Sequence, residues 1–392
     1  MASTSVKFFH SAMPGAPVLS GTAGSLISVL DLLVTGMGLK LADSLVVVNG
    51  VATLTFSSGH SFEAHAVALV AGATPAALNG GRRILAATPN TATFAAPGVP
   101  DGAATGSITA KLAGAGWEKA FTGTNLAAYR STHLSSTRMF LHVDDAAAAS
   151  ARVVGFESMS DVSTGMGPFP SAVQISQGGY WPKSNVAGPA ARAWTLIADS
   201  RGFVLHTHAG ASSGLSGSVW GFGDLAADRS GDAYACVLQC SSSDVSAGSS
   251  SAASAMEYAA ANGGGSSFMP RSFTAVGSAV NGGNGCEAYV TASSGPAGSF
   301  SNPMVPVYPN PADNSLVFTR KIVYEPNVSR RGAFRGLLFP AQNCHAAFAW
   351  RDVIDGQDEL SGRKLMAIKC GGPAGTSSQG VLFVDLTGPW GA

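Results

Sequence analysis

Short strand-like segments separated by turn residues run through most of the chain, and they limit the fold more than any other feature. Residues 46–56 read Val-Val-Val-Asn-Gly-Val-Ala-Thr-Leu-Thr-Phe, which is two alternating segments around Asn-Gly. Asn-Gly favours the tight turn of a β-hairpin, because both residues tolerate a positive φ. Similar segments follow at intervals of about 8–12 residues, which is the spacing of small all-β folds. The pattern predicts a small β-sandwich or barrel domain at residues 44–114.

The rest of the chain, residues 115–392, is predicted to be a larger β-rich domain with long loops and few short helices. Asp199-Ser200-Arg201-Gly202 fits a four-residue hairpin turn between two of its strands. A stretch rich in Ser, Ala and Gly at about 240–268 has too few apolar residues to form core, so we expect a surface loop there, with a short helix possible at 252–261. Strands are expected at 138–143, 151–156, 193–198, 203–208, 218–224, 234–239, 316–323, 336–339, 364–369 and 380–386.

The first 43 residues are predicted to form an N-terminal arm followed by a short helix. Residues 1–17 show no periodicity, and we interpret them as an extended arm that reaches an adjacent subunit. Apolar residues at 26, 29, 30, 33 and 34 have helical spacing. Ser25 is expected to cap the start of this helix and Gly36 its end.

Charged residues are scarce in this chain of 392 residues. They make up 12% of it, while hydrophobic residues make up 46%. An ordinary soluble domain has about 25% charged residues. A surface with so few charges is open to association with other protein surfaces. The composition therefore predicts a subunit that is packed against copies of itself or against other proteins.

Several classes of partner are not expected. The formal net charge is +0, so no positive field attracts nucleic acid. The densest basic spots, Arg82–Arg83, Arg320–Lys321 and Arg330–Arg331, are predicted to lie on solvated strands or turns. The start of the chain lacks the pattern of a signal peptide, and the longest apolar run, 26–33, is far shorter than the ~20 residues of a membrane helix. We expect synthesis in the cytoplasm and no membrane association.

Candidate metal ligands and nucleophiles lack the spacing that their chemistry needs. His206 and His208 lie two apart on a predicted strand and share one face, but zinc needs further ligands that the sequence does not identify. A polar strand face is the preferred interpretation. The cysteines, Cys236, Cys240, Cys286, Cys344 and Cys370, are an odd set without the spacings of a disulfide framework or a zinc module. Cys344 and His345 would point to opposite faces of a strand, so buried, reduced thiols are expected.

Acidic and aromatic residues are interpreted in the same way. Asp144-Asp145 could serve a glycosidase or a cation, but a turn and helix cap is the preferred interpretation. The cluster Asp352, Asp355, Asp358 and Glu359 lacks the EF-hand order and is predicted to be a solvated loop. Gly221-Phe222-Gly223 and Gly214–Ser218 fit neither a nucleotide motif nor a nucleophile elbow. Core or interface packing is expected for the tryptophans, with a sugar-stacking platform as the alternative: Trp117, Trp181, Trp194, Trp220, Trp350 and Trp390.

Three stretches resemble structural proteins of tailed bacteriophages. The segment 44–114, with Ser57-Ser58-Gly59-His60 and residues 70–80 and 91–94, looks like a small β-domain common in such proteins. Residues 115–130, together with 155–159, 165–170 and 221–224, are similar to uncharacterised virion proteins encoded among tail genes. Residues 331–337 also resemble a stretch of phage tail and particle proteins. The resemblance covers roughly residues 18–240 and implies a component of the virion.

The expected function is therefore structural and non-enzymatic, with no catalytic residue, metal or cofactor. The chain is expected to be a homo-oligomeric component of a phage particle, in the tail nozzle, baseplate or tail tip, with other phage structural proteins as neighbours. Two alternatives remain open: a receptor- or carbohydrate-binding tail-tip module that contacts a host-surface glycan, and a capsid-surface decoration protein. A cell-wall or capsule hydrolase that uses Asp144 or Asp145 is the least favoured hypothesis.

Overall fold

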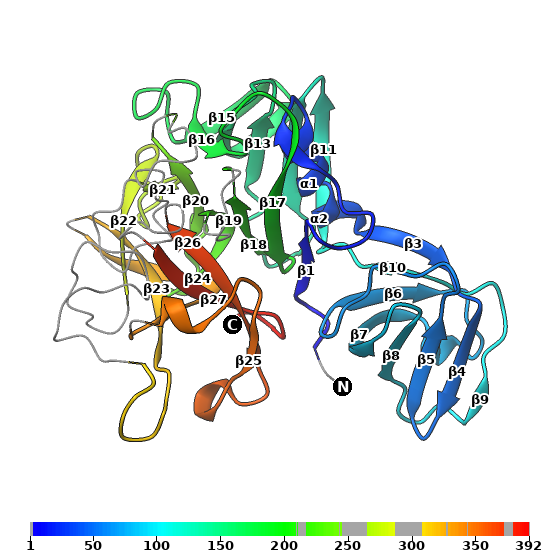
Figure 1. Ribbon diagram of the computed structural model, residues 1–392. Coiled ribbons are helices and arrows are strands. Elements are labelled where there is room, and N and C mark those ends of the chain that lie inside the picture. Colours follow the sequence, from blue (N-terminus) through cyan, green and yellow to red (C-terminus); the bar gives the residue numbers. More distant parts are fainter. Residues whose placement is uncertain are drawn as a thin grey trace.

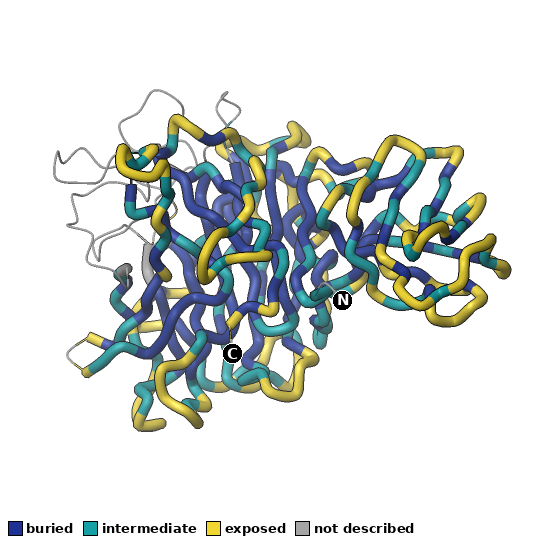
Figure 2. The backbone as a smooth tube through the Cα atoms, turned by 90° about the horizontal axis from the view of Figure 1, so that it is seen from below, coloured by how far each residue is buried: buried dark blue, intermediate teal, exposed yellow. Residues whose placement is uncertain are grey.

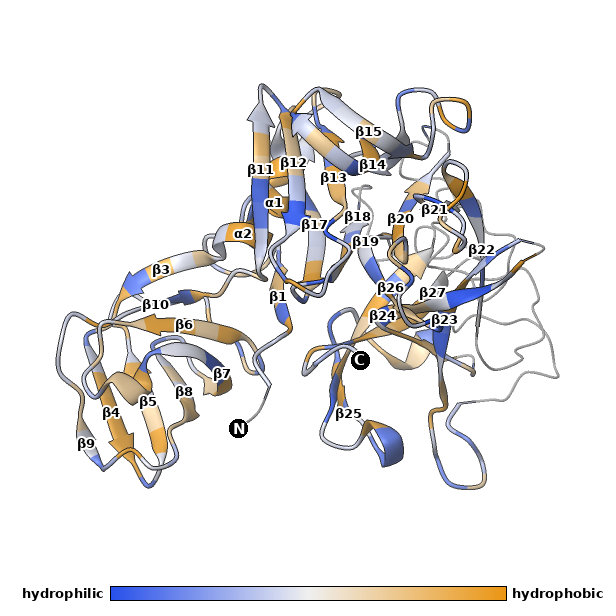
Figure 3. Ribbon diagram, turned by 180° about the vertical axis from the view of Figure 1, so that it is seen from behind, coloured by the Kyte–Doolittle hydropathy of each residue, from blue (hydrophilic) through white to orange (hydrophobic). Residues whose placement is uncertain are grey.

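The protein is mainly β, as predicted from the sequence (Figure 1). The computed structural model describes residues 3–208, 210, 217–242, 244, 265–286, 308–326, 328–342, 344–371 and 379–391. Its strands form a 19-stranded sheet system and a separate 8-stranded sheet. Figures 1 and 3 show the smaller sheet to one side of the larger body.

The smaller sheet contains the predicted Asn-Gly hairpin. Asn49 and Gly50 have φ values of 50° and 74°, as the tight turn between β4 and β5 requires. The strand order is β3-β10-β6-β7-β8-β5-β4-β9, so β3, which precedes the predicted 44–114 segment, is part of this sheet. The strands are β3 (Met37–Leu41), β4 (Ser44–Val48), β5 (Val51–Thr55), β6 (Val67–Ala71), β7 (Gly80–Ala87), β8 (Thr91–Ala95), β9 (Gly102–Ala103) and β10 (Thr109–Leu112), with the 3-10 helix η1 (Ala76–Leu78).

The first half of the larger body is an antiparallel sheet of long strands. The predicted turn after residue 198 is confirmed, since Ala198 pairs with Phe203 across it. Strand β14 is long enough to pair with β13 on one side and with β15 and β16 on the other. The strands are β11 (Trp117–Gly123), β12 (Leu126–Ser131), β13 (Phe140–Asp144), β14 (Ser150–Asp161), β15 (Thr164–Phe169), β16 (Gly179–Pro182), β17 (Gly188–Ala198) and β18 (Gly202–His208).

The second half closes into a 6-strand barrel. Each strand from β19 to β24 pairs with the next, and β24 returns to β19 through Leu225–Ala227. The final hairpin attaches to the barrel through β27 and β24. The elements are β19 (Ser218–Ala227), β20 (Cys236–Ser241), β21 (Gly265–Met269), β22 (Val280–Cys286), β23 (Phe318–Glu325), β24 (Ser329–Pro340), η2 (His345–Ala347), β25 (Val353–Asp355), η3 (Asp358–Leu360), β26 (Lys364–Gly371) and β27 (Gln379–Asp385).

The prediction of an N-terminal arm that reaches an adjacent subunit is wrong, because this segment pairs with a strand of the same chain. All four residues of strand β1 (Lys7–His10) pair with the C-terminal part of β17. Strand β2 (Leu19–Gly21) pairs with the N-terminal part of β17. Phe8, Phe9 and Met13 are buried. Strand β1 shows no alternation because both of its faces are covered, so apolar and polar residues do not alternate between core and solvent there.

The predicted helix is divided, and its cap comes from elsewhere. It consists of α1 (Ser25–Leu30) and α2 (Leu32–Thr35), with Gly36 at the C-terminal end as expected. Ser25 does not cap α1, since its hydroxyl donates to the carbonyl of Ser20 at 2.8 Å. The carboxylate of Asp145 instead accepts the amides of Leu26 and Ile27 at 2.7 and 3.1 Å.

The predicted surface loop at 240–268 is in part a strand. Residues 265–269 form β21, which pairs with β20 and β22, and Ser267 and Phe268 are buried. Strand β21 is paired on both sides within the barrel. Its residues are buried by the neighbouring strands, although the segment itself has few apolar residues. The possible helix at 252–261 lies outside the described residues.

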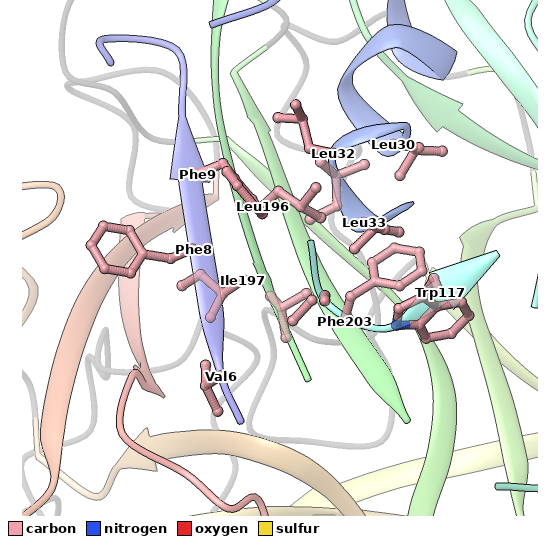
Figure 4. Close-up of a cluster of buried hydrophobic side chains, with 14 of the residues drawn as sticks. Val6, Phe8, Phe9, Leu30, Leu32, Leu33, Trp117, Leu196, Ile197 and Phe203 are labelled. Carbon is pink, nitrogen blue, oxygen red and sulfur yellow. The ribbon is translucent and has the colours of Figure 1, made fainter. Parts of the chain in front are cut away.

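A single hydrophobic cluster connects the two sheets and the short helices. It extends from Val6 of the N-terminal segment to Trp390 near the C-terminus, and Figure 2 shows the buried residues running through both parts. Figure 4 shows Leu33 of α2 beside Phe203 and Trp117, and Leu32 beside Leu196. Burying one such side chain contributes about 1.5–3 kcal/mol, so the helices are held mainly by these contacts.

Candidate functional site

The paired histidines of β18 are part of the core. His206 and His208 are 0% and 5% exposed, and the ring of His206 lies 6.0 Å from that of Trp350. Burial, with a smaller contribution from His208, lowers the pKa of His206 to about 3. Within the described part of the chain, no group of three His, Cys, Asp or Glu side chains is placed to hold a metal ion. The preferred interpretation, a polar strand face, is wrong about solvent, because both side chains are buried and Trp350 lies against the ring of His206.

The cysteines agree with the expectation of reduced, buried thiols where their side chains are described. Cys236, Cys240, Cys344 and Cys370 are buried, and none of them is in a disulfide among the described residues. Burial raises the pKa of the Cys344 thiol to about 12, so this group is not a thiolate near neutral pH. The expectation that Cys344 and His345 lie on a strand is wrong. Cys344 directly precedes the 3-10 helix η2, which begins at His345.

The two neighbouring aspartates have separate structural roles. Asp144 is half-buried, and its carboxylate accepts the amide of Ala146 at 3.0 Å, as a turn requires. Asp145 is fully buried and forms an ion pair with Lys183, which is fully buried too. Asp145 is therefore closed to a substrate. The expected turn is present, but no helix follows it, and Asp145 instead caps the distant helix α1.

The other sequence candidates also serve the fold. Asp355, in the second acidic cluster, is 73% exposed on its side chain and pairs with Lys364. The pair Gly221 and Gly223 lies in β19 between β18 and β20, and Gly214 lies outside the described residues. No sugar can stack on the five tryptophans that are at most 4% exposed: Trp117, Trp181, Trp194, Trp220 and Trp390.

The basic pairs are only partly solvated, which corrects the prediction. In two pairs the second residue is buried: Lys321 is 0% exposed and Arg331 is 1% exposed. Arg331 forms ion pairs with Asp232 at 2.9 Å and with Glu325 at 3.1 Å. Consecutive strand residues point to opposite faces, so one member of each pair turns inward once a second layer covers that face.

A cavity that the sequence did not indicate lies at one end of the barrel. Its volume is about 540 Å³, and its wall comes from the β12–β13 loop, the β17–β18 turn, the β19–β20 loop and strand β24. Three arginines line it, Arg201, Arg229 and Arg335. Asp232 is also in the wall, but its carboxylate is paired with Arg331. Arg201 and Arg335 are paired in turn, with Asp224 and Asp199, so Arg229 supplies the positive charge that no described carboxylate balances.

Arg335 is the most deeply buried of these arginines. Its side chain is 6% exposed. One terminal nitrogen donates to the carbonyl of Gly391 at 2.7 Å, and the other donates to Asp199 at 3.3 Å. Its Nε has no hydrogen-bond partner among the described residues. Burial lowers the pKa of Arg335 from its usual value, because the nearby carboxylate compensates the charge only in part.

The other two arginines have donors to spare. Arg201 uses Nε to bind Asp224 at 2.8 Å, and its terminal nitrogens donate to no described residue. Arg229 is exposed, and its guanidinium lies 3.8 Å above the ring of Phe273. Within the described chain, Arg229 has no carboxylate partner. These positions follow no common spacing in the sequence, so only the folded chain brings them together.

A second surface feature is the open edge of the smaller sheet. Strand β3 pairs with β10 and with no other described strand. Leu39 and Leu41 on β3 are 66% and 63% exposed. Thr109 lies opposite Leu41 on one side and Ala71 on the other, so this face continues across β10 to β6. The opposite edge strand, β9, has only two residues, and so short an edge offers little to pair with.

Comparison with known proteins gives no relative: no protein-family model matches the chain, and no curated protein does. No helix within the described ranges is both long and apolar enough to cross a bilayer.

Proposed function

We propose that this chain is a non-enzymatic structural subunit of a tailed-bacteriophage particle, located in the tail and assembled with copies of itself. Its other neighbours are phage structural proteins, and its location is the virion. The resemblance of its turn and packing motifs to virion proteins motivates the proposal.

The observation that carries the assembly part of the proposal is the edge strand β3. A strand that is paired on one side only and carries two exposed leucines is a template for a further strand, and a solitary soluble protein normally blocks such an edge. Met37, the first residue of this strand, is part of the core of the chain, so this end of the edge is held in place. A second copy of the chain can add a strand there and cover Leu39 and Leu41.

The low charge supports the same arrangement. Only 12% of residues are charged, and many of the described cations are used in internal ion pairs such as Arg331–Asp232 and Lys183–Asp145. Little charge is left to keep copies apart. A carbohydrate-binding module loses the support of Trp181 and Trp220, because both are fully buried. A capsid-surface decoration protein remains the second candidate, since it would use the same exposed edge.

Sedimentation of the purified chain tests the assembly part. We expect the wild type to form oligomers, and the double substitution Leu39→Lys with Leu41→Lys to weaken association roughly 100-fold, because two leucine side chains lose their burial. The matched control is Val173→Lys, since Val173 is 99% exposed in a loop and should leave association unchanged. A wild-type chain that stays monomeric and is missing from purified particles by mass spectrometry would reject the proposal.

A further inference from the structure

We propose that the arginine-lined cavity at the end of the barrel binds a phosphate, sulfate or carboxylate group, either as the free anion or carried by a sugar. This inference rests on Arg201, Arg229 and Arg335 and is independent of how the chain assembles. Guanidinium groups offer several N–H donors in a planar fork that matches such oxyanions.

The donors of the cavity exceed the acceptors that the described chain supplies to them. The Nε of Arg335 is buried without a partner, and a buried donor of this kind is stabilised when an acceptor arrives. The side chain of Arg201 interacts with one described residue, Asp224. The amides of Ser230 and Gly231, in the same wall, donate no hydrogen bond within the described residues. An anion would satisfy groups from three separate segments at once.

The size and shape of the cavity fit a small ligand. Its volume of about 540 Å³ is within the range of small-molecule sites, about 300–1,000 Å³. Ala226, Ala227 and Ala235 form an apolar part of the wall. A monosaccharide that carries an acidic group would place its ring against these alanines and its charge against the arginines.

Calorimetric titration with sodium phosphate, and in parallel with glucuronate and glucose, tests the proposal at constant ionic strength. Arg229→Gln removes the exposed arginine, and Arg201→Lys keeps the charge beside Asp224 but removes the fork. Each should weaken anion binding about tenfold, the effect of one charge-assisted hydrogen bond. Arg130→Gln is the matched control, because Arg130 is paired with Glu118 outside the cavity. Equal thermal unfolding midpoints verify that the variants are folded.

The two sources of the anion give different results. Tighter binding of phosphate than of glucuronate assigns the cavity to a free anion. Binding of glucuronate that exceeds both phosphate and glucose assigns it to an acidic sugar. Failure of both anions to bind, or binding that Arg229→Gln and Arg201→Lys leave unchanged, would overturn the proposal.

Discussion

The carboxylate of Asp145 and the ammonium group of Lys183 form an ion pair from which solvent is fully excluded. The carboxylate also accepts the amides of Leu26 and Ile27 at the start of α1, and the ammonium group donates to the carbonyl of Thr22 at 2.7 Å. One buried pair therefore connects the ends of β13 and β16 to the N-terminal helix.

Removing one partner of this pair should destabilise the protein strongly. We expect Asp145→Ala to lower the free energy of unfolding by about 3–5 kcal/mol, because it leaves the Lys183 charge buried and unpaired. Adding Lys183→Met should restore part of the loss. Urea unfolding measures both effects. Asp144→Ala is the control, and equal stability of the Asp144 and Asp145 variants would contradict this role.

Arg83 should hold both ends of the chain against the smaller sheet. Its guanidinium donates to the carbonyls of Ser3 at 2.6 Å, Leu386 at 2.8 Å and Thr387 at 3.0 Å. We expect Arg83→Ala to cost about 2–3 kcal/mol, since bonds from a charged group contribute about 1.5–3 kcal/mol.

Hydrogen–deuterium exchange of the two termini measures this effect locally. Exchange should rise at residues 3–10 and 380–391 in Arg83→Ala. The neighbouring Arg82 donates instead to the local carbonyls of Leu78 and Asn79, so Arg82→Ala should leave the termini protected. The same exchange in both variants would show that Arg83 does not tie the termini.

His206 should make the protein less stable in acid. Its pKa in the folded protein is lowered to about 3 by burial, whereas an unfolded histidine titrates near 6.5. The unfolded chain therefore binds more protons at this residue between these values, and stability falls as the pH falls through that window. The limiting slope is about 1.4 kcal/mol per pH unit.

The substitution His206→Phe isolates this contribution. Comparing its free energy of unfolding with that of the wild type at pH 8 gives the effect on packing alone. At pH 5 the variant should gain about 2 kcal/mol relative to the wild type. A difference that does not change between pH 8 and pH 5 would mean that His206 is not kept neutral by burial.

Local patterns in the sequence predicted the elements that depend on neighbouring residues. The Asn49-Gly50 turn needs only its own backbone angles, and the hairpin around Asp199–Gly202 needs only its two flanking strands. The strand alternation in residues 138–143 and 151–156 identified β13 and β14 for the same reason.

Features that depend on distant contacts could not be predicted in this way. The cap of α1 comes from Asp145, which lies 119 residues from Leu26. The sequence predicted a solvated strand or turn for Arg330–Arg331, and no local pattern indicates that Asp232 and Glu325 meet Arg331 in the folded chain. The arginines of the cavity come from three segments, so no local signal marked them.

The most direct test of the central claim is an electron-microscopy map of intact particles at a resolution that traces this chain. We expect copies arranged with rotational symmetry in the tail, with a neighbouring subunit covering β3 so that Leu39 and Leu41 are buried. Particles in which the chain is absent, or in which every copy leaves β3 open to solvent, would contradict it.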